Sequence, residues 1–176
     1  MPRKYKIVVL PGDGVGGEVI PEAVKVLKAA EETTTGLNLE FQEFDCGAHY
    51  WLKMGKKEEW PAEAFQACKE STAILFGAVG LPDAVRPNGT IVGIDLLFKI
   101  RFGLDLYANI RPVKLFQGIE CPIVGKKPED VNFVIVRENT EGLYSPMKGA
   151  LTRGGETELA VDVRVVTRKG AERVIR

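Results

Sequence analysis

KIVVLPGDGVGG, residues 6–17, is the stretch that decides the fold class. Its first part, Lys6 to Leu10, is a short apolar run rich in β-branched residues, which predicts a buried strand. Pro11 to Gly14 breaks that run with a turn, and apolar residues at helical spacing from Glu18 to Gly36 predict a helix. A strand that turns sharply into a helix is the unit from which parallel sheets are built.

The same alternation continues to residue 103. We predict strands at residues 37–44 and 73–76, a helix at residues 61–69 with Pro61 at its first position, and a helix at residues 94–103. This rhythm indicates an α/β fold with a parallel sheet. Residues 81–89 form a loop at the exit of a strand, which is the edge where such sheets bind ligands.

After residue 103 the pattern is dominated by strands. Residues 104–112 and 159–166 alternate between apolar and polar side chains, which predicts half-buried strands. Residues 131–136 are apolar except for Asn132 and predict a strand in the core. Thr167 is the predicted N-cap of a last helix, in which Ala171, Val174 and Ile175 follow at helical spacing.

Composition excludes several classes of protein. Lys and Arg number 24 and so do Asp and Glu, and the zero net charge lacks the basic footprint of a nucleic-acid binder. Cys46, Cys68 and Cys121 have no C-x-x-C spacing, so we expect neither a disulfide framework nor a zinc site, as in a reduced cytoplasmic protein. The N-terminal apolar run is too short for a signal or membrane-spanning segment, so no membrane partner is expected.

Three arginines and one tyrosine are the candidates for chemistry. Arg101 falls within the apolar stripe of its helix, where a cation needs a partner, while Arg111 and Arg137 each close a predicted strand. Together they could grip one acidic ligand, although a structural ion pair explains each of them singly. Tyr144 follows shortly after Arg137, and a phenol beside cations can have a lowered pKa and donate a proton.

The glycines at the start of the chain allow two interpretations. Gly12 to Gly17 satisfies the dinucleotide fingerprint G-x-G-x-x-G between a predicted strand and a predicted helix. A Rossmann site also needs an acidic residue about 20 residues further on, and Glu43 and Asp45 come late for that role. The alternative is a glycine-rich turn with no ligand.

Four motifs, in order, resemble one family. They are LPGDGVG at residues 10–16, GAVG at 77–80, Arg101 followed by NIRP at 109–112, and VRENTEGLY at 136–144. Together they resemble the β-decarboxylating 2-hydroxyacid dehydrogenases, which include isocitrate, 3-isopropylmalate and tartrate/D-malate dehydrogenases. Residues 96–101, 121–122, 125–128 and 133–137 are most similar to the tartrate/D-malate branch. Asp95 and Leu97 stand where isocitrate enzymes carry serine and asparagine, so isocitrate is not expected and 3-isopropylmalate remains an alternative.

The resemblance implies the isopropylmalate-dehydrogenase-like α/β fold, not the Rossmann fold, which makes the glycine fingerprint a false match. Residues 1–105 would be the N-terminal part of a large α/β domain. Residues 106–176 would be the first part of a smaller dimerisation domain, truncated within a helix. The chain is about half as long as family members, and a hairpin near residues 145–165 would pair with a second copy in a homodimer.

The resemblance also implies an activity: NAD-dependent oxidation, with or without decarboxylation, of a small 2-hydroxy dicarboxylic acid. Arg101, Arg111 and Arg137 would bind the substrate carboxylates beside Leu97, and Tyr144 would be the catalytic acid. The residues that would flank NAD are Gly80, Leu81, Pro82 and Thr90. The implied metal is Mg or Mn, whose ligands, with a lysine base, are expected outside this chain. The alternative from another class is a non-catalytic subunit or a nucleotide-binding module lacking the catalytic half.

Overall fold

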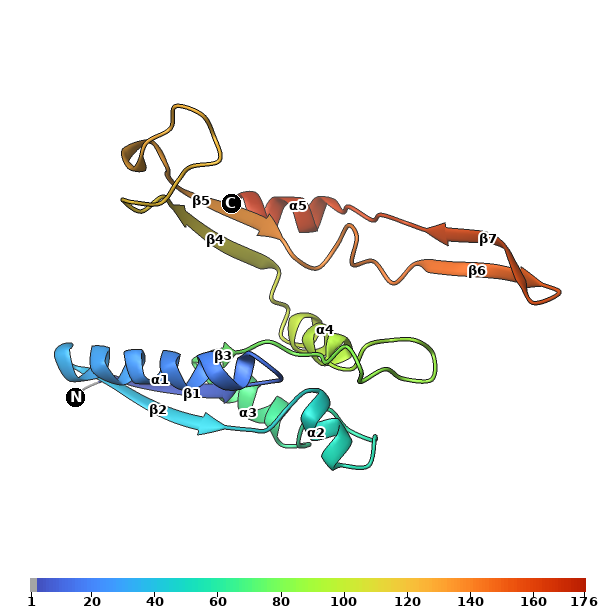
Figure 1. The fold of residues 1–176 in the computed structure, drawn as a ribbon, viewed down its shortest axis with the longest axis horizontal. Coiled ribbons are helices and arrows are strands. Elements are labelled where there is room, and N and C mark those ends of the chain that lie inside the picture. The colour runs from blue at the N-terminus through green and yellow to red at the C-terminus, as the bar shows by residue number, and fades with distance from the viewer. Residues whose placement is uncertain (1–2) are drawn as a thin grey trace. The chain divides into compact units, whose positions relative to one another are not determined.

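The computed structural model describes residues 3–176, which divide into two compact units (Figure 1). The first unit ends at Ile100 and the second is Arg101–Arg176. The first contains a parallel sheet flanked by helices, and the second is built mainly from antiparallel strand pairs. The mixed α/β architecture confirms the predicted fold class.

The sheet of the first unit has the strand order β2-β1-β3 and is parallel throughout. Its strands are β1 (Arg3–Leu10), β2 (Leu37–Glu43) and β3 (Ala73–Phe76). The central strand ends in Val8, Val9 and Leu10, which are fully buried, as the opening apolar run predicts. All three predicted strands are confirmed, β3 with the predicted bounds.

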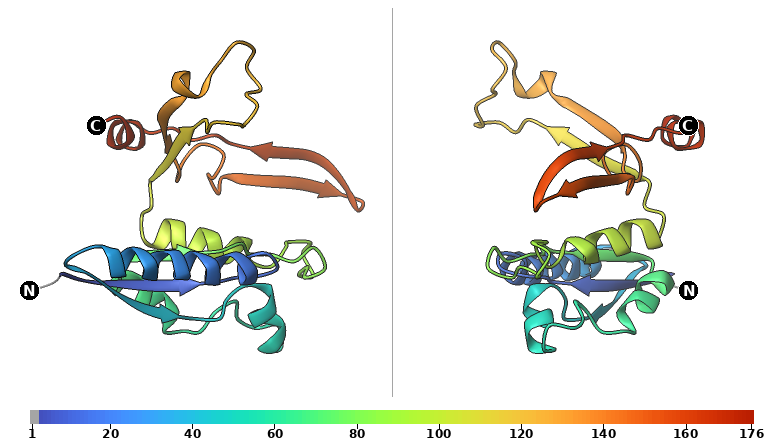
Figure 2. Two further views of the ribbon diagram at one scale, coloured as in Figure 1. Left: turned by 60° about the vertical axis from the view of Figure 1, so that its left-hand side comes forward. Right: turned by 90° about the vertical axis from the view of Figure 1, so that its right-hand side faces the viewer.

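The helices of this unit are α1 (Gly16–Thr33), α2 (Ala48–Lys53) and α3 (Ala64–Glu70), and α4 (Ile94–Gly103) begins in it and runs into the second unit, which starts at Arg101. Figure 2 shows α1 against one face of the sheet and α3 at the other. The prediction that Pro61 begins a helix is wrong, because residues 61–63 form a turn and the helix starts at Ala64. α4 has the predicted bounds, whereas the short α2 has no apolar period that would predict it.

Asp13 holds the turn between β1 and α1 in place. Its side chain is only 2% exposed and accepts three backbone hydrogen bonds: from Ala48 N at 2.7 Å, His49 N at 2.8 Å and Gly80 N at 2.8 Å. One carboxylate therefore connects this turn to the start of α2 and to the loop after β3. Nothing in the spacing of the sequence indicated this role.

The second unit contains two antiparallel strand pairs. β4 (Ala108–Lys114) pairs with β5 (Asn132–Glu138), and β6 (Lys148–Arg153) pairs with β7 (Glu156–Asp162). A 3-10 turn, η1 (Pro128–Asp130), precedes β5, and α5 (Arg168–Ile175) follows β7. Thr167 is confirmed as the N-cap of α5, since its side chain accepts a hydrogen bond from Gly170 N at 3.0 Å.

Three predictions for this unit need correction. The strand predicted at residues 104–112 starts only at Ala108, because a turn with Asp105 at φ +49° follows α4, and it continues to Lys114. The strand predicted at 159–166 lies at Glu156–Asp162 instead, directly after a two-glycine turn. Residues 131–136 are not a core strand.

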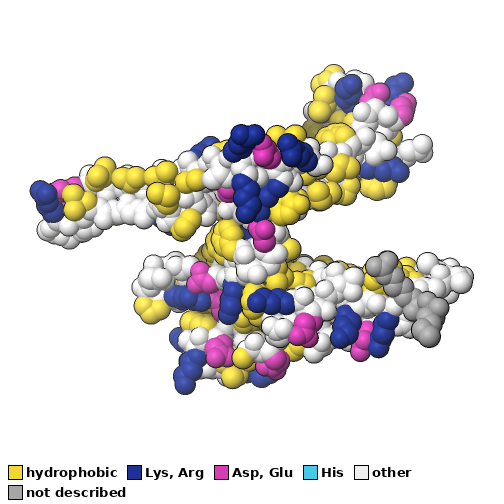
Figure 3. Space-filling model, turned by 180° about the vertical axis from the view of Figure 1, so that it is seen from behind, with side chains coloured by type: hydrophobic (Ala, Val, Ile, Leu, Met, Phe, Trp, Pro, Cys, Tyr) yellow, Lys and Arg dark blue, Asp and Glu magenta, His cyan; other side chains and the backbone are white. Residues whose placement is uncertain are grey.

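That last error concerns burial. Phe133 to Val136 are between 46% and 57% exposed, and Ile110 on the partner strand is equally open. β4 and β5 form a sheet of only two strands in the described part of the chain, so much of their surface faces solvent. Hydrophobic side chains also lie along the β6–β7 hairpin (Figure 3).

The predictions made from composition concerned membrane-spanning segments and the cysteines. No helix among residues 3–176 is long and apolar enough to cross a membrane. Cys46, Cys68 and Cys121 carry free thiols. Burial raises the pKa of the Cys46 thiol to about 12, so this cysteine stays protonated and is a poor nucleophile at neutral pH.

Candidate functional site

The candidate site of the second unit is built on one face of the β4–β5 pair. The strand register places Asn109 of β4 directly opposite Arg137 of β5. Because side chains alternate along a strand, Arg111 lies on the same face as Asn109, two residues further along. The prediction that Arg111 closes its strand is wrong, since β4 runs on to Lys114, but Arg111 and Arg137 do share a face.

Two arginines meet at the phenol of Tyr144. Arg137 Nη2 donates a hydrogen bond to Tyr144 Oη at 2.8 Å, and Arg137 Cζ lies 5.4 Å from the centre of the ring. Arg101 Cζ lies 4.6 Å from the same centre. The structure therefore brings together Arg101, Arg137 and Tyr144, which stand 43 positions apart at most in the sequence (144 − 101). The cation in the apolar stripe of α4 has an aromatic partner.

This arrangement changes the acidity of Tyr144. Partial burial opposes ionisation, but hydrogen bonds from Arg101 and Arg137, and the charges of both, outweigh it and lower the pKa of Tyr144 from its ordinary value of 10.0. The direction is the one that the sequence predicts. A phenol with a lowered pKa is a better proton donor, and the two cations stabilise the phenolate that remains after proton transfer.

Glu138 shapes the turn that carries Tyr144. Its carboxylate accepts hydrogen bonds from Thr140 N at 2.8 Å, from Thr140 Oγ1 at 2.6 Å and from Glu141 N at 2.7 Å. Burial works against the charge, but these hydrogen bonds prevail and lower the pKa of Glu138. Sequence reasoning missed this role, although acidic side chains often hold the backbone of a turn that follows a strand.

Asn139 connects this turn to the start of β4. The residue is buried, its backbone N–H donates to Tyr107 O at 2.9 Å, and its Nδ2 donates to Leu106 O at 3.2 Å. Asn109 Nδ2 donates to Asn139 Oδ1 at 3.4 Å. Arg111 Nε in turn donates to Asn109 Oδ1 at 2.9 Å, so the two asparagines connect the exposed Arg111 to the turn that leads to Tyr144.

A hollow of about 440 Å³ opens beside Arg137 and Tyr144. Its wall combines apolar side chains with a few charged groups, and they come from the turn after β5, from the segment between β7 and α5, and from α5 itself. The residues that line it include Leu143, Val166, Ala171, Val174, Ile175 and Arg164. A guanidinium at the edge of an apolar hollow suits an acidic small molecule with a hydrocarbon part.

The remaining predicted site residues lie in the first unit. Gly80 donates its N–H to Asp13, and Leu81 packs against the buried cluster of Ala48, Trp51, Ala84 and Val92. Pro82 is exposed, and Thr90 O accepts a hydrogen bond from Arg86 N at 2.9 Å. Gly80 and Leu81 thus have structural contacts, and the predicted contact of this loop with NAD stays a prediction. So does the substrate contact of Leu97, which is half-buried on α4.

The glycines of the fingerprint have a packing role. Gly12 has φ +78°, and a Cβ built on it would lie 2.0 Å from Ala78 O, so the first turn approaches the end of β3 too closely for any side chain. Asp45, near the end of β2, lies 3.1 Å from Lys53 Nζ in an ion pair. These contacts account for the glycine-rich turn without a bound dinucleotide.

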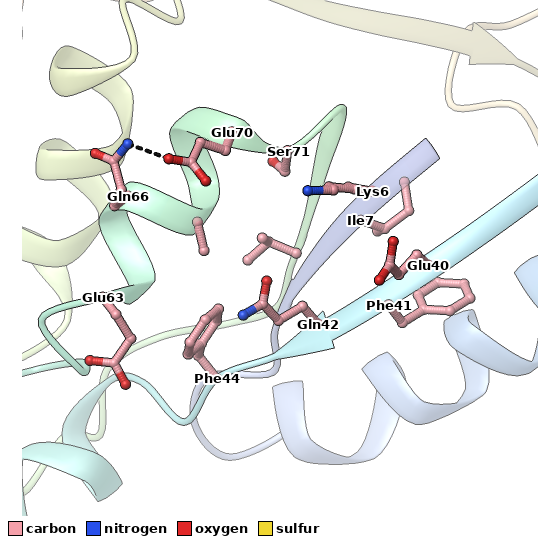
Figure 4. Close-up of a pocket in the computed structure, with 12 residues that line it drawn as sticks. Lys6, Ile7, Glu40, Phe41, Gln42, Phe44, Glu63, Gln66, Glu70 and Ser71 are labelled. Atoms are coloured by element: carbon pink, nitrogen blue, oxygen red, sulfur yellow. Dashed lines mark hydrogen bonds between the residues drawn. The ribbon is translucent and has the colours of Figure 1, made fainter. Parts of the chain in front are cut away.

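The first unit has a hollow of its own, of about 490 Å³ (Figure 4). It lies between β1, β2 and α3, and the labelled side chains include Lys6, Phe41, Phe44 and Glu63. On its α3 side, Gln66 Nε2 donates to Glu70 Oε1 one helical turn away, at 2.6 Å. None of the predicted site residues lines this hollow.

Residues 3–176 contain no group of three or more His, Cys, Asp or Glu side chains that could hold a metal ion. The described residues therefore do not fit a metal centre by themselves. The chemistry that this part of the chain can supply consists of anion binding and proton transfer.

D-malate dehydrogenase [decarboxylating] of Escherichia coli K12 is 41% identical over 177 residues, covering 100% of this chain and 48% of that protein. 3-Isopropylmalate dehydrogenase of Bifidobacterium longum DJO10A is 43% identical over 176 residues, covering 100% of this chain and 49% of that protein. The chain spans about half the length of the curated relatives it matches.

The crystal structure of isocitrate dehydrogenase from Methylococcus capsulatus has a TM-score of 0.75 and 32% identity, covering 97% of this chain and 45% of that one. The family described as isocitrate/isopropylmalate dehydrogenase matches residues 6–176. Since that match runs from the first strand to the last residue, the chain belongs to the isocitrate/isopropylmalate dehydrogenase family.

Proposed function

We propose that the protein catalyses the NAD-dependent oxidation of a small 2-hydroxy dicarboxylic acid, D-malate or tartrate, with loss of the β-carboxylate as carbon dioxide. The observation that carries the proposal is the meeting of Arg101 and Arg137 on the phenol of Tyr144. It combines groups that bind carboxylates with a group that can donate a proton. Membership of a family of hydroxyacid dehydrogenases supports the reaction class.

The arginines would bind the substrate. Guanidinium groups pair with carboxylates through two parallel hydrogen bonds, which fixes the orientation of the acid as well as its position. Arg111 is held through its Nε by Asn109, so the orientation of its guanidinium plane is set before substrate arrives. Arg101 and Arg137 are already in place at Tyr144, so the anion would bind next to the proton donor.

Tyr144 would act as the acid. Loss of carbon dioxide from the oxidised substrate leaves an enolate, which needs a proton on carbon. In that step the O–H bond of Tyr144 breaks, a C–H bond forms, and the electron pair of the O–H bond remains on the phenolate. The hydrogen bond from Arg137 and the charge of Arg101 stabilise that phenolate.

NAD and a divalent ion are part of the proposal. Pro82 and Thr90 lie on the loop that would flank the nicotinamide, and Pro82 is exposed there. Mg or Mn, when bound, supplies Lewis-acid polarisation of the new carbonyl. Since residues 3–176 form no metal cluster, the metal ligands would come from outside them.

A homodimer in the cytoplasm is the proposed state of the protein. The β6–β7 hairpin exposes Leu151, Leu159 and Val161, each about half open to solvent. A two-stranded hairpin has unpaired edges on both sides, and pairing with a second copy would cover such an edge and bury these side chains. The free cysteines suit a reducing compartment.

Substrate choice within the class rests on Leu97. An apolar side chain at this position is compatible with a substrate that carries an alkyl group, so 3-isopropylmalate is the second candidate. An enzyme of that name is 43% identical to this chain, and the D-malate enzyme is 41% identical. A non-catalytic subunit or nucleotide-binding module is the alternative of another class.

The test is NADH formation by the protein expressed from its complete gene. D-malate, tartrate and 3-isopropylmalate are supplied in turn with NAD and Mn²⁺. We expect turnover with D-malate or tartrate and its loss in Arg111→Ala. Arg168→Ala is the control, because the side chain of Arg168 is 88% exposed and forms its ion pair with Glu172 on the same helix.

Two results would contradict the proposal. Wild-type turnover in Arg111→Ala would remove that arginine from the site. NAD binding without reduction of NAD by any of the three acids would favour the non-catalytic alternative. A preference for 3-isopropylmalate would leave the reaction class intact and change the substrate.

A further inference from the structure

We propose that Arg173, on α5, is a positioning residue that holds the turn after Arg101 and the turn before Tyr144 in place together. Its relevance to catalysis rests on the proposed function, in which Tyr144 is the acid. Its structural basis does not, because it consists of contacts made by a single guanidinium with both turns.

One side of this guanidinium binds the turn that follows α4. Arg173 Nη1 donates to Asp105 Oδ1 at 2.9 Å and to Asp105 Oδ2 at 3.0 Å. Asp105 sits at φ +49°, and the same turn is closed by a hydrogen bond from Leu106 N to Arg101 O at 2.8 Å. The aspartate therefore belongs to a turn that is anchored on the backbone of Arg101 itself.

The other side binds the turn that leads to Tyr144. Arg173 Nη2 donates to Thr140 Oγ1 at 2.6 Å, and it lies 3.9 Å from Glu138 Oε1. Thr140 is held in turn by the carboxylate of Glu138, and the turn continues to Tyr144, whose N–H donates to Glu141 O at 3.3 Å. Movement of Arg173 would therefore displace both the turn that follows Arg101 and the turn that leads to Tyr144.

The surroundings keep the guanidinium in one orientation. Arg173 Cζ lies 4.5 Å from the centre of the Tyr107 ring, so the guanidinium lies against an aromatic side chain. Its side chain is only 20% exposed. Hydrogen bonds made by a charged group are stronger in a partly buried environment than at the protein surface. A planar fork that serves two acceptors at once suits arginine and not lysine.

α5 is itself fixed against the same turn. Glu141 accepts hydrogen bonds from Thr167 N at 2.8 Å and from Thr167 Oγ1 at 2.6 Å. Gly170 packs so closely on Glu141 that a Cβ there would lie 2.3 Å from its carboxylate. The helix thus presents Arg173 from a defined place, which a positioning residue requires.

Arg168 offers a matched control on the same helix. Its side chain is 88% exposed, and its ion pair is with Glu172 one turn along the helix. Exposed pairs of this kind contribute little to stability. Replacing Arg168 removes the same charge from the same helix without touching either turn.

The test follows the ionisation of Tyr144 by NMR in the full chain labelled with ¹³C at the tyrosine ring. The chain has four tyrosines, and Tyr144→Phe identifies the signal. In Arg173→Gln we expect the pKa of Tyr144 to rise towards 10.0, because Arg101 and Arg137 no longer stay in place around the phenol. Amide exchange at Thr140 and Glu141 should become about tenfold faster, which corresponds to about 1.4 kcal/mol. Arg168→Gln should change neither quantity.

An unchanged titration of Tyr144 in Arg173→Gln would overturn the proposal. If that variant does not fold, Asp105→Asn removes one acceptor and keeps the arginine, and its Tyr144 titration must shift in the same direction for the proposal to stand. The measurement needs neither NAD nor substrate. A protein without dehydrogenase activity would refute the proposed function and leave this test open to its own result.

Discussion

Replacing Asp13 with alanine is expected to destabilise the first unit by about 3–4 kcal/mol, a large share of the 5–15 kcal/mol of an ordinary domain. The residue is 2% exposed and accepts hydrogen bonds from the amides of Ala48, His49 and Gly80. Alanine would leave all three amide donors without this acceptor. The carboxylate would then no longer connect the β1–α1 turn to the start of α2 and to the loop after β3.

The magnitude follows from how far water can reach each amide. The Ala48 bond is buried, so its donor loses about 2–3 kcal/mol, while the bonds of His49 and Gly80 are partly buried and lose about 1 kcal/mol each. The sum is about 4–5 kcal/mol. Removing a buried carboxylate also removes its desolvation cost, which offsets about 1 kcal/mol.

Urea unfolding monitored by tryptophan fluorescence measures the stability of the first unit. The chain has two tryptophans, Trp51 and Trp60, and both are buried in the first unit. Asp45→Ala is the control, because Asp45 forms an exposed ion pair with Lys53 and should contribute less than about 1 kcal/mol. Equal unfolding midpoints for Asp13→Ala and Asp45→Ala would refute the role of the Asp13 carboxylate.

Two more predictions concern the glycine fingerprint and the acid dependence of stability. Gly17→Ala should leave NAD binding unchanged, because a Cβ at this position meets nothing within 4 Å and Gly17 has no positive φ. Calorimetry measures NAD binding by this variant. Loss of NAD binding in a well-folded variant would restore the Rossmann interpretation. Glu138 has a lowered pKa in the folded state, so its stabilisation is present above the ordinary value of 4.5 and is lost as the pH falls through the folded pKa. Glu138→Gln should therefore lose less stability than the parent on acidification below pH 4.5, as measured by amide exchange in the second unit, and equal losses would contradict this.

Much of the first unit was predictable from sequence because its elements end at strong signals. β3 and α4 have the predicted bounds, since Gly77 ends an apolar run and Gly103 ends an apolar stripe. The start of α3 was wrong because Pro61 fits both the first position of a helix and a turn before it. Asp13 was missed because its partners are up to 67 residues away in the chain.

The second unit shows what apolar patterning cannot reveal. Residues 131–136 are as apolar as a core strand, yet burial depends on what packs against them, and β5 has one strand partner in the described chain. Arg173 was missed because an arginine on a short amphipathic helix has the pattern of a solvated residue. The grouping of Arg101, Arg137 and Tyr144 was anticipated because a cation in an apolar stripe and a phenol beside cations both require partners.

The most direct test of the proposed chemistry is the steady-state rate at which D-malate is converted to the protonated keto acid, with NAD and Mn²⁺, by the protein expressed from its complete gene and by Tyr144→Phe. Phenylalanine keeps the ring between Arg101 and Arg137 and removes only the hydroxyl that Arg137 contacts. We predict that kcat falls by about 10²–10⁴, as expected for loss of a general acid, while KM changes little. A Tyr144→Phe enzyme that forms the protonated keto acid at the parent rate would contradict the assignment of Tyr144 as the proton donor.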